Sequence, residues 1–127
     1  MGGEYRIEGL DENYTASHMA KLFVAYCGHE VARAERVNAN LSTVSLVGVP
    51  RNMDPLPDGR LGSARKVEVW RLDGGQVEFI LRWQDHFVAD LVRMFLARIA
   101  HGERADGRRV RAYSGQTGHE FVMEPGR

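Results

Sequence analysis

The sequence is poor in the residues that staple or anchor small proteins. Of its 127 residues only Cys27 is a cysteine, so an intramolecular disulfide and a four-cysteine zinc site are both excluded. No apolar run approaches the roughly 18 residues of a membrane span, and the first residues lack the basic and then apolar pattern of a signal peptide. We therefore expect a soluble, cytoplasmic protein without a membrane partner.

The sequence also lacks an excess of either charge. Seventeen basic residues balance seventeen acidic ones, so no overall field attracts the protein to nucleic acid or to an anionic membrane. Nearly all of the basic residues are arginines, which suit bidentate contacts with carboxylates and phosphates. A single domain over residues 1–127 can bury roughly two-thirds of its unfolded surface, so its core needs no disulfide or metal.

The clearest pattern lies in residues 75–102. Apolar side chains occupy every second position of residues 77–83, which predicts a strand with one buried face. Asp85 follows as an N-cap, and apolar residues then recur every three or four positions, which predicts a helix from His86 to a C-cap at Gly102. The apolar positions of this helix are Val88, Leu91, Val92, Phe95 and Ile99.

The N-terminal half combines one helix with three strands. Thr15 is the predicted N-cap of a helix that ends at Gly28. Residues 30–37 fit either an imperfectly alternating strand or a continuation of this helix. We favour the strand, because a glycine inside a helix costs about 1 kcal/mol. The predicted strands are residues 4–10, 30–37 and 43–49, and a turn at residues 38–40 joins the last two as a hairpin.

Prolines and glycines separate this half from the rest of the chain. Residues 50–64 contain three prolines and two glycines and predict a long inserted loop. Asp73-Gly74-Gly75 predicts a tight hairpin turn, and Asp106-Gly107 predicts a second turn. The strands expected around these turns are residues 66–72, 77–83, 109–113 and, near the C-terminus, 120–123.

This order of elements predicts an α+β fold. A mostly antiparallel sheet would carry two helices on one face. Without the inserted hairpin and loop, and with the last short strand set aside, the order is βαββαβ, which is that of a ferredoxin-like core.

At this level the chain resembles an RNA-recognition-motif domain. Residues 5–10, Tyr-Arg-Ile-Glu-Gly-Leu, are similar to the first-strand motif of that family. Residues 75–83 with the following helix match its third strand and second helix, and residues 106–111 match its last turn and strand. Thr15, Leu22, Phe23 and Gly28 lie near the expected offsets. The resemblance implies a ferredoxin-like fold and RNA binding by bases stacked on aromatic side chains of the first and third strands.

The alternation along these two strands places their aromatic side chains on the buried face instead. Tyr5, Phe79 and Trp83 share the phase of the core, because successive side chains point to opposite faces. The other face carries Arg6, Glu8, Glu78, Ile80 and Arg82. Nucleic-acid binding is therefore the alternative function. It would use Arg6, Arg82, Arg108, Arg109 and Arg111.

No combination of residues predicts an enzyme. The five histidines never occur at the i, i+4 spacing of a helical zinc site, and residues 114–118 lack the lysine of a P-loop. We interpret Asp85 beside His86 as a helix cap, and Cys27 near His29 as a packing residue. We expect no catalytic residues, no metal and no cofactor.

The predicted second helix is more apolar than contact with one sheet face requires. A helix that is apolar nearly all round is buried on more than one side. Residues 50–63 and the C-terminal strand could supply the extra cover, and so could another subunit. The candidate interface residues are Val92, Met94 and Leu96. The sequence thus predicts a non-catalytic adaptor that binds a protein partner or a second copy of itself, through this helix or through an exposed sheet edge.

Overall fold

The computed structural model describes residues 2–51 and 65–121. Most of the predicted inserted loop, residues 50–64, lies outside the described residues, as does the end of the last predicted strand. The strands are β1 (Gly3–Glu8), β2 (Ala32–Asn38), β3 (Leu41–Leu46), β4 (Arg65–Gly74), β5 (Gln76–Trp83) and β6 (Arg111–Ser114). The helices are α1 (Ala16–Cys27), a short 3₁₀ turn η1 (His86–Val88) and α2 (Ala89–Ala105).

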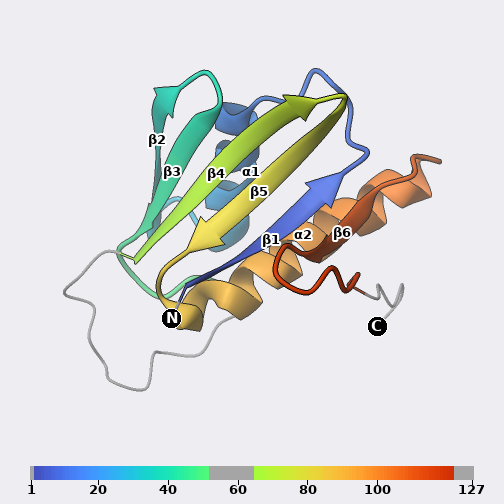
Figure 1. Ribbon diagram of the computed structural model, residues 1–127. Coiled ribbons are helices and arrows are strands. Elements are labelled where there is room, and N and C mark those ends of the chain that lie inside the picture. Colours follow the sequence, from blue (N-terminus) through green and yellow to red (C-terminus); the bar gives the residue numbers. More distant parts are fainter. Residues whose placement is uncertain (1, 52–64, 122–127) are drawn as a thin grey trace.

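The six strands form one antiparallel sheet in the order β2-β3-β4-β5-β1-β6. Both helices lie against the same face of this sheet, and within the described residues no helix covers the other face (Figure 1). The predicted α+β class is confirmed. The order of the complete sheet differs from that of a four-stranded ferredoxin-like sheet, because the β2–β3 hairpin extends it beyond β4.

Short-range signals fix the first helix as predicted. The Thr15 hydroxyl accepts a hydrogen bond from the His18 main-chain N–H at 2.9 Å, which caps α1. Gly28 ends the helix with a φ of 116°, a conformation that favours glycine. The ambiguous residues 30–37 are largely strand, since they overlap β2, and the predicted hairpin with the next strand is confirmed.

The second helix begins where expected and ends later. The Asp85 carboxylate accepts from the Phe87 N–H at 3.0 Å, so it acts as a cap. The predicted end at Gly102 is wrong, because α2 continues to Ala105. Gly107, with a φ of 86°, follows the helix and donates to the Arg104 carbonyl at 3.0 Å. A glycine inside a helix costs only about 1 kcal/mol, and the better C-terminal glycine lies one turn further on.

The core lies between the helices and the covered face of the sheet. The Phe79 side chain is 0% exposed and Trp83 is 5% exposed, so both rings point inward as predicted. Phe23 of α1 and Phe95 of α2 bring their ring centroids to 5.0 Å, which joins the two helices over the sheet. The open face carries the charged side chains of these strands together with a few apolar ones, among them Trp70 and Ile80.

Replacing Phe79 by alanine tests this arrangement. We expect Phe79→Ala to lower the free energy of unfolding by about 3–5 kcal/mol, because it leaves a cavity beneath both helices. Urea denaturation followed by circular dichroism measures the change. Gln76→Ala, at an exposed position of the same strand, is the matched control and should change stability by less than about 0.5 kcal/mol. Equal effects of the two variants would contradict the inward placement of the ring.

Candidate functional site

Two of the three residues predicted to line a protein interface are inside the protein's own core. Val92 and Leu96 are fully buried, so a partner of the folded chain cannot contact them. Met94 is partly exposed. Much of the extra cover of α2 comes from α1, because Phe23 and Tyr26 both stack against Phe95.

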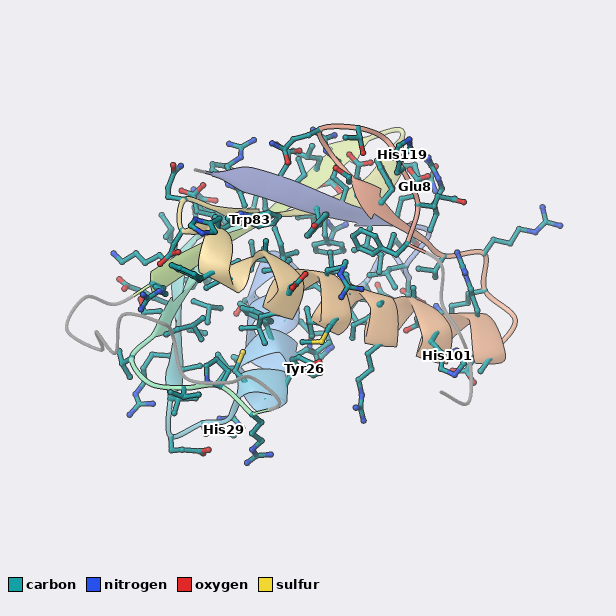
Figure 2. All side chains as sticks on the ribbon, turned by 90° about the horizontal axis from the view of Figure 1, so that it is seen from below. Glu8, Tyr26, His29, Trp83, His101 and His119 are labelled. Atoms are coloured by element: carbon teal, nitrogen blue, oxygen red, sulfur yellow. The ribbon has the colours of Figure 1, made fainter. Side chains whose placement is uncertain are left out.

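One stretch of α2 faces a groove on the side away from the sheet. The groove has a volume of about 590 Å³ and an apolar floor to which both helices contribute. Tyr26 projects into the region between the helices (Figure 2), and burial raises the pKa of its hydroxyl. The floor consists of Leu22, Tyr26, Phe95 and Ile99, and the charged rim of Arg51, Arg98, Glu103 and Asp106.

On the open sheet face, carboxylates neutralise the arginines proposed for nucleic-acid binding. Arg6 contacts Glu4 at 2.7 Å and Glu78 at 2.9 Å. Arg82 contacts Glu4 at 3.1 Å. Burial alone would raise the pKa of Glu4, but hydrogen bonds from Arg6 and Arg82 and their positive charges lower it below its ordinary value of 4.5.

The arginines that follow α2 are largely paired as well. Arg108 lies 3.1 Å from Glu103 and 3.3 Å from Asp11. Arg111 lies 3.2 Å from the Glu8 carboxylate and 2.6 Å from that of Glu120. Of the five candidate arginines, only Arg109 lacks a carboxylate partner within the described part of the chain. The five therefore do not form one continuous basic patch.

Two aromatic side chains on the open face were missed from the sequence. Trp70 of β4 and Tyr113 of β6 lie in one row across the sheet, with Ile80 and Arg6 between them. Val67 and Val69 of the same strand are buried. Because side chains alternate along a strand, this pattern could have placed Trp70 on the open face. The Tyr113 hydroxyl donates to Glu78. Burial and this hydrogen bond raise the Tyr113 pKa to about 12.

Three of the five histidines, His29, His101 and His119, lie in separate parts of the molecule (Figure 2). In residues 2–51 and 65–121, no group of three or more potential ligands is placed to hold a metal ion. Asp85 caps η1 and forms an ion pair with Arg65. Burial raises the pKa of the Cys27 thiol to about 12, which leaves it unreactive at neutral pH.

The edge strand β2 offers an unpaired main chain. Every residue of β2 except Ala32 is exposed, and in the described chain no segment pairs with its outer side. The Val47 N–H donates to the Val31 carbonyl at 2.8 Å. Because main-chain groups alternate in direction along a strand, Arg33 and Glu35 bond toward β3. The N–H and C=O groups of Ala32, Ala34 and Arg36 point outward.

The opposite edge is shorter. It is formed by the four residues of β6, and Tyr113 there makes a single bridge to Glu120.

Comparison with protein-family models, curated proteins and solved structures finds no significant match. No helix within the described residues is both long and apolar enough to cross a bilayer.

The Glu4 ion pairs give the protein a defined dependence on pH. The lowered pKa of Glu4 means that its ionised form stabilises the fold above pH 4.5, and that this stabilisation is lost as the pH falls through the folded-state pKa. We expect Glu4→Gln to lower the free energy of unfolding at pH 7 by about 1 kcal/mol. The loss of stability below pH 4.5 should also become shallower.

Urea denaturation between neutral and acidic pH measures both effects. Glu12→Gln removes a carboxylate from an exposed position outside these ion pairs, so its loss of stability at acidic pH should match that of the unmodified protein. If Glu4→Gln also leaves the loss of stability at acidic pH unchanged, the Glu4 ion pairs make no contribution to stability.

Proposed function

We propose that this protein is a non-catalytic adaptor module that self-associates through the free edge of β2. The exposed main chain of β2 is the observation that supports this function. An unpaired edge is a template for adding a strand from another chain, and proteins usually protect it with prolines, bulges or a covering segment. Residues 32–36 contain no proline and run in regular register with β3, and the register shifts only beyond them, between Arg36 and Asn38.

The charged side chains of β2 could themselves be such a protection, because like charges repel an incoming strand. Here both signs are present. Arg33 and Glu35 project from the open face two residues apart, since their partners Ser45 and Thr43 lie in rows with Lys66 and Glu68. A strand of opposite pattern would meet complementary charges rather than repulsion.

The fold proposed for this module is a ferredoxin-like core with an added hairpin. Four neighbouring strands of the sheet, β4, β5, β1 and β6, would form this core. In the chain, α1 follows β1 and α2 follows β5, which is compatible with the order βαββαβ. In this interpretation, the β2–β3 hairpin is the insertion that supplies the free edge. We also propose that the domain is related to RNA-recognition motifs and that the protein is cytoplasmic.

Nucleic-acid binding is the second candidate function. The aromatic pair Trp70 and Tyr113 on the open face favours it, because exposed rings can stack bases. The carboxylates of Glu4, Glu8 and Glu78 count against it, since they neutralise the neighbouring arginines and would repel phosphate. We therefore rank it below self-association.

A labelled single-stranded RNA separates the two functions. We expect fluorescence anisotropy with a fluorescein-labelled oligouridine to show no saturable binding at about 200 mM salt, and at most weak binding at about 50 mM. Binding that is saturable at the higher salt and is lost in Trp70→Ala, but not in the control Leu72→Ala, would favour the alternative. Leu72 is exposed on the same strand.

Proline at the centre of β2 tests self-association. Ala34→Pro removes an N–H that points outward, so the internal β2–β3 hydrogen bonds are kept while the edge can no longer pair fully. We expect multi-angle light scattering of the unmodified protein to give about twice the 14.3 kDa of one chain, and of Ala34→Pro to give the monomer mass. Ala34→Thr keeps the N–H and should remain dimeric.

Circular dichroism and thermal melting establish that each variant is folded. If the unmodified protein is still a monomer at a concentration on the order of 100 µM, self-association is overturned as a function. A folded Ala34→Pro variant with the mass of a dimer would move the interface away from β2.

A further inference from the structure

We infer that the strand added to β2 is β2 of a second copy, paired antiparallel about a two-fold axis through Ala34. This inference rests on the proposed self-association and specifies its partner and register. The argument uses the direction of the main-chain groups, the charges of the side chains and the space beside the strand.

The outward groups of β2 suit a two-fold pairing centred on Ala34. The main-chain N–H and C=O groups of Ala32, Ala34 and Arg36 point away from β3, as follows from the Val47–Val31 hydrogen bond. With Ala34 opposite Ala34 of the second copy, Ala32 lies opposite Arg36 and Arg36 opposite Ala32. All of these are hydrogen-bonded pairs, so each outward group in residues 32–36 finds a partner.

Side-chain charges select this register over its neighbours. When Ala34 lies on the axis, Arg33 faces Glu35 of the second copy and Glu35 faces Arg33. These are non-hydrogen-bonded pairs, in which side chains approach most closely. An axis at residue 33 would place the two Arg33 side chains opposite each other. An axis at residue 35 would do the same with the two Glu35 side chains, and an axis at residue 36 with the two Arg36 side chains. Like charges directly opposite each other are destabilising, so of the registers with an axis at residues 33–36 only that at Ala34 is free of them.

Both charged residues are available for this pairing. Arg33 and Glu35 are exposed, and neither has an ion-pair partner among the residues that the structure describes. The Arg33 guanidinium now donates to the main-chain carbonyls of His29 and, at 3.1 Å, of Ala32. Pairing would transfer the Ala32 carbonyl to a main-chain N–H of the second copy and release Arg33 for the partner's carboxylate.

The side of β2 that faces the helix layer leaves space for the second copy. Ala34 and Arg36 are exposed on that side, and the small Ala32 is the side chain opposite Arg36 in the pair. The two-fold axis is perpendicular to the sheet, so the helices of both copies lie on the same side. The two sheets then continue into one another across the β2 strands.

Charge reversal tests the register without altering the main chain. We expect Glu35→Arg alone, and Arg33→Glu alone, each to raise the dimer dissociation constant by about tenfold or more, because each change creates two like-charge pairs. The double variant Arg33→Glu/Glu35→Arg should restore the dissociation constant to within about threefold of the unmodified protein. Sedimentation velocity over a concentration series measures these constants.

Mixing the two single variants is the sharper test. In a heterodimer of Arg33→Glu with Glu35→Arg every facing pair is again of opposite charge, so the mixture should dimerise more tightly than either variant alone. Glu12→Arg changes the net charge equally at an exposed position away from β2, and it should leave the dissociation constant unchanged.

The outcomes separate this register from the proposed function. If Ala34→Pro abolishes the dimer but neither the double variant nor the mixture restores what the single reversals lose, edge pairing stands and the Ala34 register is wrong. If the single reversals leave the dimer intact, the register is likewise overturned. If the unmodified protein is a monomer, self-association itself fails, and this inference fails with it.

Discussion

The one-sided burial of the sheet is the constraint on which the rest of the structure depends. Both helices cover one face, so the strands direct most of their apolar side chains to that face, whereas Trp70 and Ile80 lie on the other. Phe79, Leu81 and Ile7 are fully buried on the covered side. The alternating positions carry Glu78, Arg82 and Arg6, whose charges are balanced by ion pairs within β1 and between β1 and β5.

This balance shapes what the open face can bind. Arginine binds phosphate well because its guanidinium forms paired hydrogen bonds, but on this face those hydrogen bonds are already used by glutamates. A phosphate would have to displace a carboxylate that is held in place by the strand register. The surface is therefore better suited to stiffening the sheet than to attracting a polyanion, and the unpaired β2 edge remains as the more available contact.

Much of the fold could be predicted because its signals are local. The period-two pattern of residues 77–83, the Thr15 cap and the glycine at residue 28 each depend only on neighbouring residues, and the structure agrees with all three. Gly102 was misread because a glycine followed by further helix-forming residues does not have to end a helix. Asp106 and Gly107 form the stronger stop signal.

The candidate site was less predictable because it depends on contacts distant in sequence. The apolar breadth of α2 was visible, but the sequence could not show that Phe23 and Tyr26 of α1 would cover it, so Val92 and Leu96 were assigned to an outer surface. Trp70 lies on β4, outside the two strands that carry the stacking aromatics in RNA-recognition motifs, so the resemblance does not point to it. The position of β2 at an edge follows from strand order, which no local pattern encodes.

The unequal length of the two sheet edges limits how far such chains can assemble. If β2 paired with β6 of the next molecule, each addition would expose a new β2 and growth would continue into fibres. The four residues of β6 offer too short a ladder for this, and their neighbour Glu120 already bridges to Tyr113. In the proposed β2–β2 pairing, an edge that recognises only its own copy would close after one addition, and this closure would keep a concentrated solution of the protein from gelling.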